Sequence, residues 1–196
     1  GAMTAPLALW TNLRNPVAVR GSHFQGASDI FTLVKAIEAF NVPADQSPTG
    51  RAIRFDSSKI GFFGHGLGAT LGAIAVPYDP RVGITVWSGL GASWTERLLN
   101  QREPLDVAYG IGLKLQEYAD GDAGGVEKRH PVLNLYQDFW DVVDPMNHLG
   151  FLGGLNLQQH ILILSAAGDE EVPKQARDTA ARILQAEVVG PASYPP

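Results

Sequence analysis

Short apolar runs alternate with helix-like stretches along most of the chain. The runs Lys59 to Phe63, Val82 to Trp87 and Ile161 to Ser165 have the length and apolar character of strands. Helices are predicted from Leu67 to Ala75 and from Pro173 to about Gln185. The alternation predicts an α/β fold with a mainly parallel sheet flanked by helices. Because the third run is continuous in Ile and Leu, we expect it to be covered on both faces.

An amphipathic helix is predicted before the first strand, from Asp29 to Phe40. Ser28 is suited to cap its first turn, and the apolar positions inside it recur at helical spacing. These positions are Ile30, Leu33, Val34 and Ile37. A polar, proline-containing loop from Asn41 to Asp56 then leads to the first strand.

The alternation breaks between residues 89 and 157. Helix-like stretches lie there at Trp94 to Asn100, Leu105 to Tyr118 and Val132 to Val143. We expect this region to be a helical insertion or lid within one domain that spans residues 1–196. The proline-rich residues 190–196 are expected to form a tail, and residues 1–2, Gly-Ala before a methionine, resemble the remnant of a removed tag.

Composition narrows the possible functions. The chain has 196 residues, 45% of them hydrophobic, enough for one domain with a sizeable core. It contains neither an apolar run long enough for a membrane span nor a recognisable signal peptide, and its native compartment is left open. The net charge of -5, without a basic stripe, argues against nucleic-acid binding. The absence of cysteine excludes disulfides, thiolate nucleophiles and cysteine-based zinc sites.

Residues 59–69 read as a strand, a glycine-rich turn and the start of a helix. This is the frame that presents the catalytic serine in the pattern G-x-S-x-G. Gly64 and Gly68 are its outer glycines, which are expected to let the strand and the helix pack closely. His65 precedes the tip, and Gly66 occupies the serine position. Glycine has no hydroxyl, so the chain lacks the usual means of starting covalent acyl transfer at this point.

A longer series of residues carries a family resemblance. It consists of Asn15-Pro16, Arg20, Gln25, Asp29, Gly64-His65-Gly66-Leu67-Gly68, Asp144-Pro145 and Gly168-Asp169 before Val172-Pro173. From about residue 10 to residue 190 the chain resembles bacterial α/β-hydrolases of the lipase/esterase type, whose elbow typically reads G-H-S-L-G.

The resemblance implies a partial α/β-hydrolase core that needs neither cofactor nor metal. In an active parent it implies hydrolysis of a carboxylic ester or lipid through an acyl-enzyme. Gly66 then replaces the nucleophile, the amide of Leu67 stands where the first oxyanion-hole donor would be, and Asp169 stands at the triad acid. This chain is therefore expected to be inactive or very weak.

The triad histidine has no counterpart in the expected place. All five histidines precede Asp169, whereas the order in this family is nucleophile, acid, histidine. The chain also begins near the helix before the elbow strand, so the early strands and the loop with the second oxyanion donor are expected to be absent. Either the chain is a fragment or inactivated form of a larger hydrolase, or it is a remnant with a non-catalytic role in binding or assembly.

The elbow itself admits two other interpretations. It could be only a tight connection between strand and helix. It could also cradle a dinucleotide, because Gly64-x-Gly66-x-x-Ala69 fits the G-x-G-x-x-G/A fingerprint. A dinucleotide site expects an acidic residue at the end of the next strand, where the chain instead has Trp87-Ser88-Gly89.

The other singled-out residues have structural alternatives as well. Asp169 could cap the following helix, and His65 could serve packing or hydrogen bonding. The aromatic residues Tyr136, Phe139 and Trp140 are expected in the core, with an acyl pocket as the alternative. A metal site is conceivable at Asp138, Asp141, Asp144 and His148, although a solvated face explains these residues as well.

The predicted loss of early strands has a consequence for assembly. A parallel sheet without them exposes a hydrogen-bonding edge and apolar faces, which monomers seldom tolerate. Self-association is therefore expected.

Overall fold

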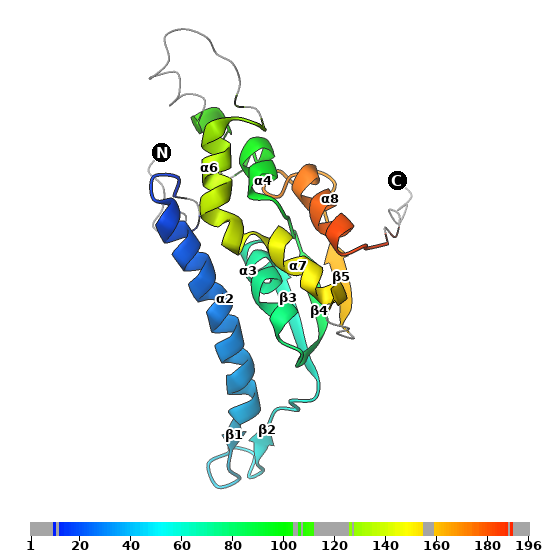
Figure 1. The fold of residues 1–196 in the computed structure, drawn as a ribbon. Coiled ribbons are helices and arrows are strands. Elements are labelled where there is room, and N and C mark those ends of the chain that lie inside the picture. Colours follow the sequence, from blue (N-terminus) through cyan, green and yellow to red (C-terminus); the bar gives the residue numbers. More distant parts are fainter. Residues whose placement is uncertain are drawn as a thin grey trace.

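A small parallel sheet forms the centre of the fold. The computed structural model describes residues 10, 12–103, 106, 108–111, 126, 128–154, 159–187 and 189. The sheet has the order β3-β4-β5, with β3 at Ile60–His65, β4 at Val82–Ser88 and β5 at His160–Leu164. All three strands are parallel, and helices flank them (Figure 1). The fold is mixed α/β, as the alternation predicts, and each strand lies within one residue of the predicted bounds at its start.

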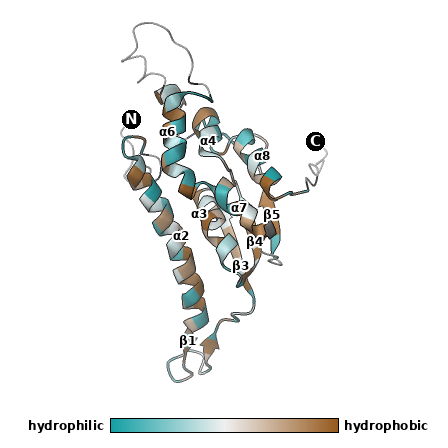
Figure 2. Cartoon of the chain, in the orientation of Figure 1, coloured by the Kyte–Doolittle hydropathy of each residue, from teal (hydrophilic) through white to brown (hydrophobic). Residues whose placement is uncertain are grey.

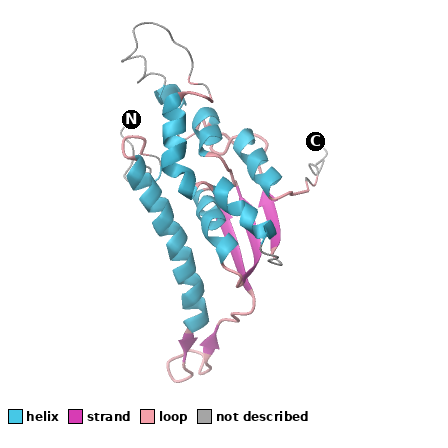
Figure 3. Cartoon of the chain, viewed as in Figure 1, coloured by secondary structure: helices cyan, strands magenta, loops and turns pink. Residues whose placement is uncertain are grey.

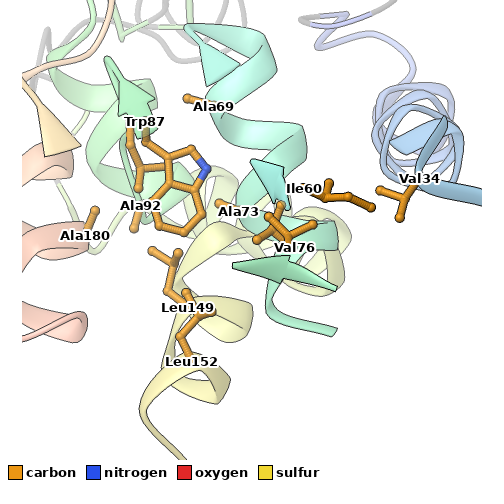
Figure 4. Close-up of a cluster of buried hydrophobic side chains, with 12 residues drawn as sticks. Val34, Ile60, Ala69, Ala73, Val76, Trp87, Ala92, Leu149, Leu152 and Ala180 are labelled. Carbon is orange, nitrogen blue, oxygen red and sulfur yellow. The ribbon is translucent and has the colours of Figure 1, made fainter. Parts of the chain in front are cut away.

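Three helices cover one face of this sheet, which we call the inner face. They are α3 (Leu67–Ala75), which continues into the 3₁₀ helix η1 (Val76–Tyr78), α7 (Pro145–Gly154) and α8 (Lys174–Ile183). Trp87 of β4 is fully buried between them, next to Ala73, Leu149 and Ala180 (Figure 4). The close packing of α3 depends on its small residues, because large side chains would hold the helix away from the sheet.

A second layer of helices packs outside α3. It contains α2 (Pro16–Ala39), α4 (Trp94–Asn100), α6 (Pro131–Trp140) and the 3₁₀ helix η2 (Asp141–Val143). Figure 1 shows α2 as the long helix that runs beside α3 and α6. Their shared core is centred on two buried tryptophans, Trp94 and Trp140, whose ring centroids are 5.3 Å apart.

The predicted start of the first helix is wrong. The helix begins at Pro16, and the side chain of Asn15 caps it by accepting a hydrogen bond from the amide of Ala18. Ser28 lies within the helix and donates its hydroxyl to the carbonyl of Phe24 instead of capping. Proline at the first helical position is favourable because its missing N–H would have no partner there.

The predicted loop from Asn41 to Asp56 contains a short hairpin. The strands β1 (Asn41–Val42) and β2 (Ile53–Arg54) pair antiparallel. The rings of Phe40 and Phe55, 4.7 Å apart, pack beside this pair.

The prediction that the third strand is covered on both faces is also wrong. The face of the sheet opposite α3, which we call the outer face, carries large apolar side chains that are 45% to 68% exposed: Phe63, Ile84, Leu162 and Leu164. The strands are among the most apolar parts of the chain (Figure 2), yet the described helices that pack on the sheet do so on the inner face (Figure 3).

The region from residue 89 to 157 is helical where it is described. It holds α4, which has the predicted bounds, and α6 with η2, which extend one residue beyond the predicted start. It also holds α7, which the sequence analysis missed and which covers the inner face of the sheet. Most of Leu105 to Tyr118, residues 1–2 and residues 190–196 lie outside the described residues. Among the described helices, none is both long and apolar enough to cross a membrane.

Candidate functional site

The turn between β3 and α3 forms a sharp elbow at Gly66. Its backbone has φ 54° and ψ -114°, a combination that glycine adopts easily and that strains any residue with a Cβ. The Gly66 amide donates to the carbonyl of Ser88 on β4 at 2.9 Å, and its own carbonyl accepts from Thr70 at 3.1 Å. A Cβ added to Gly66 would meet no atom within 4 Å. The backbone conformation would strain a residue with a Cβ, but the space around that Cβ is open, so a side chain at this position would be accessible.

Leu67 is the first residue of α3. Its amide finds no hydrogen-bond acceptor among the described residues, as expected for the first turn of a helix. The amides of this turn and the helix dipole favour negative charge in front of Gly66.

The outer glycines of the elbow differ in their roles. A Cβ on Gly64 would lie 2.6 Å from the carbonyl oxygen of Gly68, so a glycine is needed there for β3 and α3 to approach. A Cβ on Gly68 would meet nothing within 4 Å, so that glycine is not required by packing. Gly72, which the sequence analysis did not single out, is the second close contact, because a Cβ there would collide with the ring of Phe62.

Asp169 faces the elbow across Gly89. A Cβ added to Gly89 would lie 3.8 Å from Asp169 Oδ2 and 3.8 Å from the amide nitrogen of Gly66. The other carboxylate oxygen, Oδ1, accepts from the amides of Glu171 at 3.0 Å and Val172 at 2.8 Å. Asp169 therefore holds its own loop with one oxygen and presents the second toward the elbow. The residue next to the first turn of α8 is Pro173, so Asp169 is not its N-cap.

A cation that the sequence analysis missed lies beside the elbow. One terminal nitrogen of Arg97 donates to the hydroxyl of Thr70 at 3.3 Å, and the guanidinium lies 5.0 Å from the ring centre of Trp94. Its Nε is buried and has no partner among the described residues. Removal from solvent lowers the pKa of Arg97, while the carboxylates of Glu171 and Asp169 act in the opposite direction. Because α4 comes from a distant part of the sequence, no local pattern indicates this contact.

His65 pairs with Ser88 on the neighbouring strand. The two residues are register partners of β3 and β4, and Nδ1 of His65 lies 2.9 Å from Oγ of Ser88. The imidazole is exposed and the serine half-buried, and both side chains lie on the outer face.

Three of the other four histidines form hydrogen bonds within the protein. Nδ1 of His23 bonds to the carbonyl of Val19, and His130 accepts the amide of Val132. Nδ1 of His148 bonds to the hydroxyl of Tyr78, and His160 begins β5. No hydrogen bond in the described part of the chain joins a histidine to Asp169.

Of the four residues considered for a metal site, Asp138 is exposed on α6 and the other three have protein partners. Asp144 is fully buried and accepts four hydrogen bonds, from the amides of Ser93, Trp94 and Met146 and from the side chain of Gln137. Within the described residues no group of three metal-ligating side chains comes together.

The aromatic stripe divides between core and surface. Trp140 is 1% exposed and Tyr136 stacks on it, whereas Phe139 is 38% exposed. The strand β4 ends at Ser88 and has no carboxylate at its end. The dinucleotide interpretation therefore lacks the acidic residue that it requires.

Comparison with known proteins gives no assignment. Neither models of protein families nor curated proteins match the chain.

Proposed function

We propose that the chain carries the elbow of a serine hydrolase for carboxylic esters, with glycine in place of the nucleophile. In this proposal the fold is the partial core of an α/β-hydrolase, and the chain does not hydrolyse esters through the elbow. The observation that carries the proposal is the backbone of Gly66, which is held at φ 54° and ψ -114° between a parallel strand and a helix.

Two further features support it. The amide of Leu67, which has no acceptor among the described residues, is the donor that would stabilise a tetrahedral oxyanion in front of Gly66. The carboxylate of Asp169 borders the same space and keeps Oδ2 available for orienting an imidazole.

In an active form, a serine at position 66 would attack the ester carbonyl. Its proton would pass to a histidine held by Asp169, the alkoxide would leave with that proton, and water would then hydrolyse the acyl-enzyme. None of the five histidines follows Asp169 in the sequence or bonds to it in the described structure. The described chain therefore has neither a nucleophile at position 66 nor a histidine at Asp169 to act as general base.

The elbow is best tested with a cysteine, because the chain contains none. Gly66→Cys places a thiol at the first turn of α3, where the dipole and the Leu67 amide stabilise a thiolate. We expect its pKa to lie at least about one unit below that of Ser57→Cys, an exposed loop position that serves as the control. Alkylation rates with iodoacetamide, measured against pH, give both values. Equal thiol pKa values in a folded Gly66→Cys protein would contradict the elbow assignment.

Gly66→Ser tests the second half of the proposal. Without a base to take its proton, a serine hydroxyl is a poor nucleophile at neutral pH. We expect this variant to release no p-nitrophenol from p-nitrophenyl butyrate beyond the rate of the unmodified chain. Robust turnover that is lost again in Gly66→Ala would mean that one of the existing histidines serves as base.

A non-catalytic role in binding or assembly is the second candidate. The outer face supports it, because Phe63 is 68% and Leu162 52% exposed on a parallel sheet, a class of sheet that is normally covered on both sides. The two functions are compatible, since a chain that has lost its nucleophile can keep a binding surface.

A further inference from the structure

We propose that the His65–Ser88 pair is a second nucleophilic site, which is acylated by neutral esters whose acyl chain lies on the apolar outer face. The proposal concerns a different residue from the elbow and does not depend on it.

The pair has the geometry of a nucleophile and its base. The 2.9 Å separation of Nδ1 and Oγ lies within hydrogen-bond reach, and the tautomer with its proton on Nε2 accepts the serine proton. The bond from the Gly66 amide to the Ser88 carbonyl fixes the end of β4 beside β3. The ring of His65 is exposed in a single copy of the chain, so a reagent in solution reaches the pair in the monomer.

The surroundings of the pair favour a neutral, apolar reagent. Ser88 is the register partner of Leu164 on β5, and one step further along the strands Phe63, Val86 and Leu162 lie in one row. The outward positions of the three strands carry no Asp, Glu, Lys or Arg. A row of apolar side chains without charged neighbours, next to a serine and an imidazole, suits a neutral ester with an apolar acyl chain.

The reaction balances within these groups. Oγ of Ser88 forms a bond to the ester carbonyl carbon while its proton moves to Nδ1 of His65. The bond from that carbon to the alkoxy oxygen then breaks, and the leaving oxygen takes the proton. The product is O-acyl-Ser88 and a free alcohol. Water attacking with the same base releases a carboxylic acid and restores the serine.

The test uses p-nitrophenyl acetate and p-nitrophenyl octanoate with intact-mass and peptide-mass analysis. We expect one acyl group per chain, on Ser88, and none in Ser88→Ala. Ser165→Ala is the matched control, since Ser165 is an exposed serine near the end of β5 without a histidine partner in the described structure. His65→Gln keeps a polar side chain but removes the base, and we expect acylation to slow by about a hundredfold or more.

A second measurement tests the acyl surface. Transfer of methylenes from water to the outer face should make octanoate react faster than acetate, on the order of tenfold. Leu162→Ser should lower the octanoate to acetate ratio. Leu33→Ser removes a leucine of α2 that is 61% exposed, against 52% for Leu162, and should leave the ratio as it is.

Three results would overturn the proposal: acylation of other residues, equal rates in the unmodified chain and His65→Gln, or a ratio that Leu162→Ser does not change. If Ser88→Ala does not fold, the acylated residue in the unmodified chain decides the first point. A low thiol pKa in Gly66→Cys together with no acylation of Ser88 would leave the elbow assignment standing and remove only this inference.

Discussion

The carboxylate of Asp144 accepts the backbone amide of Trp94 at 2.8 Å across 50 residues of sequence. The same side chain accepts the amide of Met146, which is at the start of α7, at 2.9 Å. One buried carboxylate thus accepts hydrogen bonds from backbone amides in the first turns of both α4 and α7, which have no partner within their own helices. It joins the helix that carries Arg97 to the helix that covers the sheet.

This arrangement predicts a large loss of stability in Asp144→Ala. The substitution removes the acceptor of four donors, of which the amide of Trp94 is buried and the other three are partly buried, and we expect the free energy of unfolding to fall by roughly 3 to 5 kcal/mol. Urea denaturation followed by tryptophan fluorescence measures the change. Asp138→Ala, at an exposed position on α6, should change it by less than about 0.5 kcal/mol. Similar values for the two variants would mean that the Asp144 bonds contribute little.

The three glycines of the elbow should respond differently to alanine. Gly64→Ala forces its Cβ against the backbone of Gly68 and should be the most destabilising of the three. Gly66→Ala has room for its Cβ but must adopt φ 54°, at a cost of about 1 to 2 kcal/mol. Gly68→Ala meets open space inside a helix and should stabilise the protein by up to about 1 kcal/mol.

Thermal unfolding of the three variants tests this order. A Gly64→Ala protein as stable as Gly68→Ala would show that β3 and α3 do not approach as closely as described. An equal loss in Gly66→Ala and Gly64→Ala would contradict the expected order, in which the collision at Gly64 costs more than the backbone strain at Gly66.

The sequence predicts the parts of the fold whose signals are local. The strand bounds follow from short apolar runs, and α4 follows from Ser93, which caps it by accepting the amide of Glu96. The first half of α2 also has a local start signal, the cap Asn15 before Pro16, but Gly21 and Gly26 dilute the helical pattern that follows it. Gly26 is present for contact with α3, where a Cβ would lie 2.7 Å from Leu71.

The residues of the candidate site also differ in whether a local sequence signal predicts them. Gly66 and Asp169 could be expected at one edge of the sheet, since the carboxyl ends of parallel strands meet there. Arg97 could not, because α4 reaches the elbow region only through helix packing. The exposure of β5 could not be predicted either, because a run of Ile and Leu does not indicate which of its faces is covered.

His23 makes stability depend on pH. Burial between the rings of Trp10 and Trp94 lowers its pKa from 6.5 to about 4, and the nearby cation of Arg97 acts in the same direction. Because Nδ1–H donates to the carbonyl of Val19, the proton added in acid must go to the buried, unpartnered Nε2.

The folded pKa lies below the unfolded one, so the unfolded chain binds the proton first as the pH falls. Stability is complete above pH 6.5 and is lost between pH 6.5 and about pH 4, by roughly 3 kcal/mol from this group. Urea denaturation at pH 7.5, 5.5 and 4 measures the loss. His23→Leu should remove this part of the pH dependence, and an unchanged profile in a folded His23→Leu protein would assign it to other groups.

The outer face should drive self-association. Its exposed apolar side chains lie beside the outer edge of β5, where backbone groups of the described sheet have no neighbouring strand. Sedimentation velocity over the micromolar range should show species larger than a monomer whose fraction grows with concentration. The double variant Phe63→Ser, Leu162→Ser should shift the distribution toward monomer, because it removes two large exposed apolar side chains of the outer face. Leu33→Ser, which removes a comparable leucine from α2, should leave the distribution unchanged. A compact monomer at all concentrations, or equal effects of the two sets of substitutions, would show that the outer face is not the surface through which copies of this chain meet.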